Sequence, residues 1–148
     1  MRNDIIQFLK AKAYRKIRDL GRGATGQTVL LHDDSIDEDF VCKKYVPCDE
    51  YFKEEFYKRF VEEIKLLYKM NHPRIVRVFN YYLYPDQWTG YILMEYINGS
   101  DIEQYLLSNL HSFDDLFKQT IDGFAYLESQ NILHRDIRTT NILVTNQG

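Results

Sequence analysis

Residues 132–144 read Ile-Leu-His-Arg-Asp-Ile-Arg-Thr-Thr-Asn-Ile-Leu-Val, a polar segment with apolar residues at both ends. Apolar ends of this kind anchor a segment in a core while its middle faces a cleft, which is how a rigid scaffold presents reactive groups on a loop. Within the segment, Asp136 precedes Asn141 by five residues. A carboxylate can accept a hydroxyl proton, and an amide oxygen can hold a hard cation such as magnesium. The segment therefore contains a candidate base and a candidate metal ligand.

The composition is that of a globular domain and excludes some classes of function. The chain has 148 residues, of which 45% are hydrophobic and 15% aromatic, so it is long enough to bury a core. Its net charge of -3 argues against a nucleic-acid binder, which would carry a basic face. No apolar run approaches the roughly 18 residues of a membrane span. Cys42 and Cys48 are too few for a disulfide framework, and together these features predict a cytoplasmic protein.

A glycine-rich segment lies between two predicted strands, residues 14–20 and 28–31. Its glycines are Gly21, Gly23 and Gly26. Backbone N–H groups of such a segment can approach phosphate oxygens because no side chain intervenes. A dinucleotide-binding unit has the same glycine spacing, but it requires a helix directly after the glycines, and here a short β-branched apolar run follows. A hairpin flap is the preferred interpretation, and a plain hairpin turn is the alternative.

Residues 40–45 are predicted to form a third strand that carries Lys43 and Lys44. Successive side chains of a strand point to opposite faces, so one of the two lysines points into the cleft. The alternative is an edge strand on which both lysines are solvated.

Residues 51–70 are predicted to form a long helix with one apolar arc. The members of the arc are Phe52, Phe56, Phe60, Leu67 and Met70. Glu63 falls inside this arc, and burying a carboxylate on an apolar face is costly unless a cation meets it. Glu63 is therefore expected to have a cationic partner.

The rest of the chain predicts two more strands and then helices. Pro73 ends the long helix, and residues 75–83 and 91–96 are the fourth and fifth strands. Ser100 and Asp101 are candidate N-caps of a first helix, and Ser112 begins a second long helix. An apolar stripe on this last helix comprises Phe113, Leu116, Phe117, Ile121, Phe124 and Leu127. The predicted fold class is α+β, a small antiparallel five-stranded sheet with one long helix, followed by helices.

The order of these features resembles that of eukaryotic-type protein kinases. Glycine flap, strand lysine, helix glutamate, link, long helix and His134-Arg135-Asp136 loop occur once each in that order, and the resemblance runs from Tyr14 to Val144. It implies a kinase-like fold with an ATP-binding lobe over 14–97, and a hinge and partial helical lobe over 98–148 that ends after the catalytic loop. The apolar pattern before this region predicts a separate N-terminal helix within residues 1–13. The implied activity is transfer of a phosphoryl group from ATP, with Mg²⁺, to a hydroxyl of a protein substrate, in the manner of a serine/threonine-protein kinase.

The resemblance also implies roles for the residues of the catalytic group. Asp136 would orient the attacking hydroxyl and accept its proton, and Asn141 would bind Mg²⁺. Lys43 would hold the α- and β-phosphates and pair with Glu63. Arg138 belongs to the same group, but it stands where Ser/Thr kinases usually have Lys, so the substrate class stays open.

The remaining residues that the resemblance assigns to the nucleotide site come from the flap, the strands and the hinge. They are Gly21, Gly23, Gly26, Thr28, Val41, Met94, Glu95, Ile97, Asp101 and Leu143. Thr28 departs from the family, which usually has Val there. A register shifted by one residue would make Lys44, and not Lys43, the phosphate lysine.

A second departure is that the Asp-Phe-Gly of kinases does not occur before Gly148. We therefore expect the chain alone to transfer phosphate poorly, because a metal ligand is missing. We also expect a partner or a second copy to cover the apolar stripe on the helix over 113–127, including Phe113, Phe117, Ile121 and Phe124. The alternative function is a truncated pseudokinase or a regulatory nucleotide-binding module without catalysis.

Overall fold

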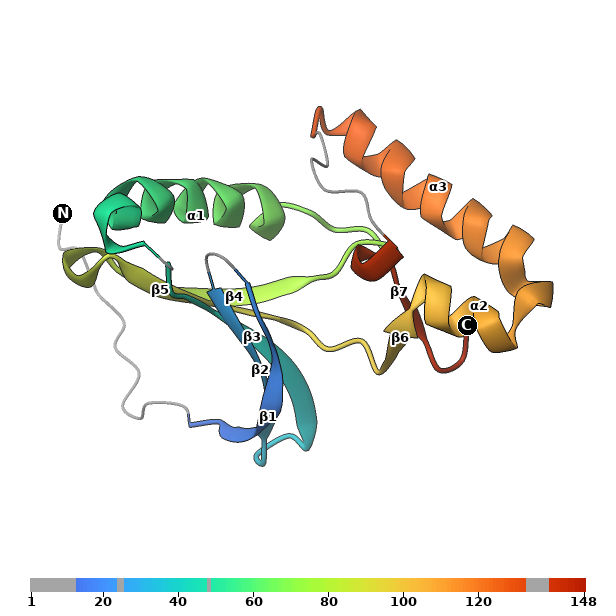
Figure 1. Cartoon of the computed structure of the whole chain (residues 1–148), viewed down its shortest axis with the longest axis horizontal. Helices are drawn as coiled ribbons and strands as arrows, with labels where there is room; N and C mark the ends of the chain where they lie inside the picture. Colours follow the sequence, from blue (N-terminus) through green and yellow to red (C-terminus); the bar gives the residue numbers. More distant parts are fainter. Residues whose placement is uncertain (1–12, 24–25, 48, 133–138) are drawn as a thin grey trace, which may run out of the picture.

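A five-stranded antiparallel sheet with one long helix across its face forms the first part of the molecule (Figure 1). The computed structural model describes residues 13–23, 26–47, 49–132 and 139–148. The strand order in the sheet is β1-β2-β3-β5-β4. The strands are β1 (Arg15–Arg22), β2 (Gly26–Asp33), β3 (Glu38–Tyr45), β4 (Val78–Tyr84) and β5 (Thr89–Glu95).

The remaining elements follow β3 and β5. The helix on the sheet is α1 (Lys53–Tyr68), and the helices after β5 are α2 (Ile102–Ser108) and α3 (Phe113–Ser129). A second, two-stranded sheet pairs β6 (Gly99–Asp101) with β7 (Leu143–Thr145). It lies with α2 and α3 beyond residues 96–98, which we call the link after β5 (Figure 1). Short 3₁₀ turns are η1 (Glu50–Phe52), η2 (Pro85–Gln87), η3 (Leu110–Ser112) and η4 (Thr139–Asn141).

The predicted five-stranded sheet and its long helix are confirmed, with two differences. The fourth strand begins at Val78 and not at residue 75, because Ile75 closes a turn in which its N–H donates to the carbonyl of His72 at 3.1 Å. The small β6–β7 sheet was not predicted. Each of its strands has three residues, too few for an alternating pattern to be visible in the sequence.

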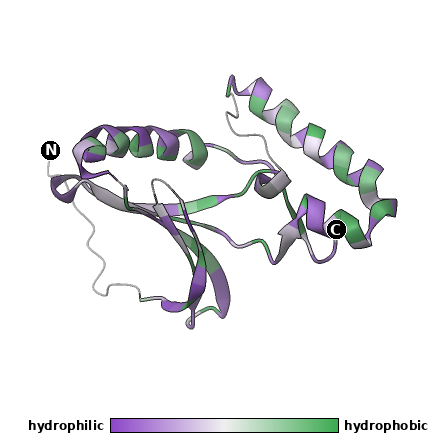
Figure 2. Ribbon diagram, viewed as in Figure 1, coloured by the Kyte–Doolittle hydropathy of each residue, from purple (hydrophilic) through white to green (hydrophobic). Residues whose placement is uncertain are grey.

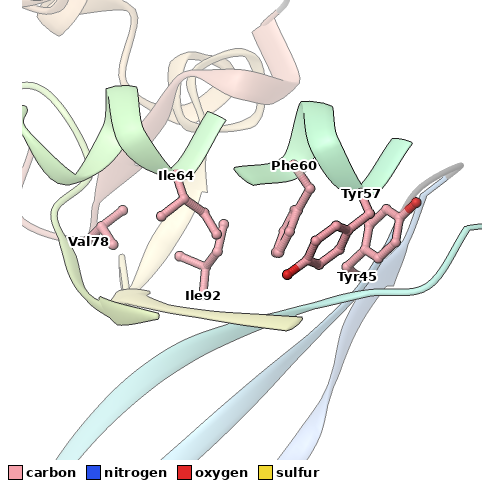
Figure 3. Packing of buried hydrophobic residues seen from close by; sticks show 6 residues of the cluster. All are labelled: Tyr45, Tyr57, Phe60, Ile64, Val78 and Ile92. Carbon is pink, nitrogen blue, oxygen red and sulfur yellow. The ribbon is translucent and has the colours of Figure 1, made fainter. Parts of the chain in front are cut away.

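The core lies between α1 and the sheet (Figure 3). The buried cluster comprises Tyr45, Tyr57, Phe60, Ile64, Val78 and Ile92. The Tyr45 hydroxyl donates to the Lys53 carbonyl at 2.8 Å, so its polar atom is satisfied at the start of α1. Burial raises the pKa of Tyr45, and that of Tyr57 for the same reason, so both phenols stay neutral in the core.

The buried face of α1 agrees with the predicted arc at four of its five residues. Phe60 and Met70 are buried, and Phe56 and Leu67 are half-buried against the core. Tyr57, Phe60 and Ile64 are the buried residues of the helix, whereas Phe52 precedes it and is 41% exposed. Tyr57 and Ile64 are seven residues apart and therefore share one side of the helix, which rests on Ile92 and Tyr45 (Figure 3). Tyr57 and Ile64 were not part of the predicted arc, although the ring of tyrosine packs like that of phenylalanine.

The segment between α1 and β4 holds helix α3 against the first part of the molecule. The backbone N–H of Asn71 donates to the Tyr126 hydroxyl at 3.0 Å, and the His72 ring stacks on the Tyr126 ring at 4.7 Å. Gly123 of α3 is buried, and a Cβ there would lie 3.2 Å from Cβ of Arg74. Helix α3 is thus anchored by direct contacts with residues 71–75.

The other side of α3 carries exposed apolar side chains, and Figure 2 shows hydrophobic residues along this helix. Phe113, Phe117 and Ile121 are 52%, 55% and 50% exposed, and the first two rings stack at 6.1 Å. Leu116 and Leu127 are buried, and Phe124 is half-buried. The expected apolar surface is present at three of the four residues, and its coverage by a partner or second copy stays a prediction.

Within the part of the chain that the structure describes, none of the helices has the length and apolar content that crossing a membrane requires.

We predict that replacing Phe60 by Ala lowers the free energy of unfolding by about 3–5 kcal/mol, because it leaves a cavity between α1 and the sheet. Phe60→Leu keeps most of the volume and should cost less than about 1.5 kcal/mol. As a control, Phe117→Ser on the exposed side of α3 should change the value by no more than about 0.5 kcal/mol. Urea denaturation followed by circular dichroism measures all three, and an equal loss for Phe60→Ala and Phe117→Ser would contradict this core.

Candidate functional site

A pocket of about 340 Å³ lies between the sheet, the link after β5 and strand β7. Its volume is within the range of about 300–1,000 Å³ that is usual for small-ligand sites. The lining is mainly apolar, with one guanidinium and one carboxylate. The lining residues are Arg18, Leu20, Thr28, Val41, Val76, Met94, Glu95, Tyr96, Ile97, Gly99 and Leu143.

The register of the sheet determines which side chains face this pocket. Directly paired residues of antiparallel strands lie on the same face. Leu30 pairs with Val41, and Val41 pairs with Met94, so these three form one row across β2, β3 and β5. Val41 and Met94 line the pocket, so this row faces it.

A second row lies on the same face, two residues away from the first on each strand. It consists of Thr28, Lys43 and Ile92. Lys44 pairs with Tyr91 on the opposite face, where its ammonium lies 5.6 Å from the centroid of the Tyr91 ring. Of the two lysines on β3, Lys43 is therefore the one on the pocket's side of the sheet.

Lys43 meets Glu63 of α1. The distance from Lys43 Nζ to Glu63 Oε1 is 3.6 Å, with the two side chains 28% and 48% exposed. Glu63 lies at the edge of the buried face of α1, and not within it as predicted, because the helix rests on the side of Tyr57 and Ile64. Ion pairs this exposed contribute about 0–1 kcal/mol to stability. The pair therefore positions the ammonium more than it stabilises the fold.

The three flap glycines differ in whether the surrounding atoms leave room for a side chain. A Cβ on Gly26 would lie 2.7 Å from the Lys44 carbonyl oxygen and 3.4 Å from Cε of Lys43. Gly26 is thus needed for the close approach of the flap to β3. A Cβ on Gly21 or Gly23 would meet no atom within 4 Å. Packing of the described residues gives no reason for these two glycines.

The link after β5 presents backbone groups at the pocket. The Glu95 N–H donates to the Arg77 carbonyl at 2.8 Å, and the Arg77 N–H donates to Glu95 Oε2 at 3.2 Å, which fixes the start of the link. Ile97 lines the pocket, and among the described residues its N–H has no hydrogen-bond acceptor. The link therefore has a free donor beside the pocket.

The floor of the pocket depends on the pairing of β6 with β7. Gly99 pairs with Thr145, and Asp101 pairs with Leu143, which lines the pocket. A Cβ on Gly99 would overlap the Val144 carbonyl oxygen. Only glycine allows this approach of the two backbones, so Gly99 is required for the floor.

The remaining predicted residues lie around this pocket or outside the described part. Oδ1 of Asp101 accepts from the Gln104 N–H at 2.9 Å and caps α2, as the sequence predicted, and Asp101 does not line the pocket. Asn141 ends η4, two residues before the lining residue Leu143. Asp136 and Arg138 fall within residues 133–138, which lie outside the described residues.

The described residues were also compared with what Mg²⁺ requires. They contain no group of three His, Cys, Asp or Glu side chains placed to hold a metal ion. Asn141 offers one amide oxygen, a ligand type that Mg²⁺ accepts when waters and phosphate oxygens supply the rest. Among the described residues, the donor set therefore fits Mg²⁺ only together with other ligands, such as waters and phosphate oxygens.

Five lining residues were missed by sequence reasoning: Arg18, Leu20, Val76, Tyr96 and Gly99. Leu20 directly precedes the flap and Val76 follows the turn at Pro73, so their positions in the motifs gave a usable signal. Gly99 lay within the predicted segment over 98–148 and was given no role of its own. Cys42 contributes no reactive thiol, because burial raises the pKa of its side chain.

Comparison with known proteins identifies the class. The family model "Protein kinase domain" matches residues 14–148. The chain therefore belongs to the protein kinase family.

The relatives are similar over most of this chain. "Serine/threonine-protein kinase PrkC" of Bacillus subtilis (strain 168) is 30% identical over 139 residues, which are 91% of this chain and 21% of that protein. "Tyrosine-protein kinase SPK-1" of Girardia tigrina is 33% identical over 95 residues, 60% of this chain and 19% of that protein. The chain thus spans about a fifth of the length of these two relatives.

A solved structure, "PpkA-294 apo form", has a TM-score of 0.75 and 17% sequence identity, and the match covers 98% of this chain and 59% of that one. At this identity the similarity supports the fold alone, an α+β protein-kinase fold of which this chain has a part.

We predict that Gly99→Ala disrupts the floor of the pocket, because its methyl group would collide with the backbone of β7. Amide hydrogen exchange at residues 143–145 should become faster, and the melting temperature should fall. Gly23→Ala is the matched control, since a Cβ there meets nothing within 4 Å, and it should leave both readouts unchanged. Unchanged exchange at 143–145 in Gly99→Ala would contradict the β6–β7 pairing.

Proposed function

We propose that this chain is the nucleotide-binding part of a protein kinase and that its pocket binds ATP. The observation that supports this most is the arrangement of the sheet face. The apolar row through Val41 and Met94 lines the pocket, and the next row carries Lys43, held near Glu63 at 3.6 Å. Residues two apart on an antiparallel strand are separated by about 7 Å. A base between Val41 and Leu143 would then have its phosphates directed toward Lys43.

In this proposal the link after β5 binds the edge of the base. The Ile97 N–H donates to a ring nitrogen, and the Glu95 carbonyl accepts from an exocyclic amine. Support comes from the free donor at Ile97 and from the backbone hydrogen bond that fixes Glu95. Met94 forms the back of the pocket, and Thr28 lies in the wall where kinases usually have Val.

The flap is proposed to cover the phosphates. Gly21 and Gly23 have open space where a Cβ would stand, which leaves room for phosphate oxygens near their N–H groups. Gly26 brings the flap close to the side chain of Lys43. Asp101 is proposed to face the ribose with the carboxylate oxygen that does not cap α2.

The proposed activity of the whole protein is that of a transferase acting on a protein hydroxyl, with Ser/Thr as the preferred substrate class. Bound ATP supplies the phosphoryl group. Asp136 is proposed to accept the proton of the hydroxyl, Arg138 is proposed to belong to the same catalytic group, and Asn141 is the proposed ligand for Mg²⁺ that accompanies the nucleotide. The similarity to a kinase named as serine/threonine-specific supports the substrate class.

We predict that Lys43→Met raises the dissociation constant for ATP at least about tenfold, because a charge-assisted hydrogen bond to phosphate is lost. Lys44→Met is the matched control. It removes the same charge from the other face of β3 and should bind ATP like the wild type. Isothermal titration calorimetry of the two variants, with circular dichroism to verify folding, measures the effect.

Adenosine binding, measured in the same experiment, distinguishes contacts with the nucleoside from contacts with the phosphates. It has no phosphates, so its affinity should be the same in wild type and Lys43→Met. An equal loss of ATP affinity in both lysine variants would contradict the role of Lys43. A wild-type chain that binds neither ATP nor adenosine at millimolar concentration would overturn the proposed function.

A further inference from the structure

Arg18 is one of the residues that line the pocket. Arg18 lies in β1, the edge strand of the sheet, and pairs with Leu30 of β2. Leu30 belongs to the row that continues through Val41 to Met94. Since paired residues share a face, the guanidinium lies on the same face as the apolar wall of the pocket.

In the part of the chain that the structure describes, Arg18 forms no ion pair, and the acidic residue next to it in sequence and the one that shares the pocket lining have other partners. Asp19 Oδ1 lies 2.9 Å from Lys16 Nζ and accepts from Gln27 at 3.0 Å, contacts that lower the pKa of its carboxyl. Glu95, which shares the pocket lining, accepts from the Arg77 N–H. Among the described residues, a guanidinium with five donors thus remains available at the pocket.

Arg15 lies on the same strand and, unlike Arg18, has a counter-ion among the described residues. Its guanidinium donates to Asp34 Oδ1 at 2.9 Å, an interaction that raises the pKa of Arg15 and lowers that of Asp34. Arg15 does not line the pocket. The two arginines are three residues apart, and the one with its own counter-ion is the one away from the pocket.

The position of Arg18 indicates which half of a nucleotide it would meet. The phosphate end of the site is marked by the Gly21–Thr28–Lys43 row, next to the flap. Arg18 belongs to the neighbouring row, on the side away from the flap turn, together with the residues that would hold the base. A phosphate bound near Lys43 therefore lies at the other end of the pocket.

We infer that Arg18 is a binding residue of this site and that its guanidinium contacts the nucleoside half of the nucleotide, not the phosphates. This inference rests on the proposed function. A planar donor-only group suits the acceptor nitrogens of the base and the hydroxyl oxygens of the ribose, and it can also stack on an aromatic ring. Arg18 thereby adds a charged donor to a pocket whose other described walls are mainly apolar.

The test compares ATP and adenosine binding by calorimetry in wild type, Arg18→Gln and Arg15→Gln. Arg18→Gln should weaken both ligands by a similar factor, about tenfold, as expected for loss of one charge-assisted contact. Arg15→Gln removes an equal charge from the same strand and should bind both ligands like the wild type. Thermal melts establish that both variants fold.

The possible outcomes separate this inference from the proposed function. Loss of ATP affinity with unchanged adenosine affinity in Arg18→Gln would mean a phosphate or general charge effect and would overturn the inference. If Arg15→Gln lost as much affinity for ATP and adenosine as Arg18→Gln, the inference would be overturned as well. Wild-type binding of both ligands, unaffected by Arg18→Gln, overturns the inference alone. A wild type that binds neither ligand overturns the proposed function and the inference together.

Discussion

The antiparallel register of β2, β3 and β5 is the constraint on which the candidate site depends. It places Val41 and Met94 in one row and Lys43 in the next, on a single face of the sheet. A shift by one residue would turn Lys43 to the side of Tyr91 and bring Lys44 toward α1. The register is fixed by the core, because Tyr45 and Ile92 must face Phe60 and Ile64 for α1 to pack. Burial of the core and orientation of the lysine are therefore decided together.

The ion pair between Lys43 and Glu63 follows from this register and has little effect on the stability of the fold. Both side chains keep contact with solvent, so their attraction adds little to stability. Its consequence is geometric, since Glu63 of α1 holds the ammonium of Lys43 on the face of the sheet that carries the pocket. Two glycines complete the site because they let backbone segments approach closely. Gly26 lets the flap approach β3, and Gly99 lets β6 approach β7. Each permits a backbone contact that any side chain would prevent.

Much of the fold could be predicted because its signals are local. The glycine flap, the strand with two lysines and the long helix have patterns that are visible within ten to twenty residues, and the two-residue alternation already required the lysines to point apart. Most of the apolar face of α1 was predicted, but Phe52 is exposed and Tyr57 was left out, because its hydroxyl obscures an apolar ring. The β6–β7 sheet joins residues more than forty positions apart through very short strands, a contact that no local pattern encodes. Arg18 was missed for a related reason: a charged residue on an edge strand looks solvated until the register shows which face it shares.

The most direct test of the account is an NMR titration of the isotope-labelled chain with ATP. The account predicts shift changes at the Ile97 amide, at the methyl groups of Val41, Met94 and Leu143, and at the Lys43 side chain, whereas Phe117 and Ile121 on α3 stay unchanged. Changes confined to α3, or no change in the Val41 and Leu143 methyl groups at saturating ATP, would contradict a nucleotide site on this face of the sheet.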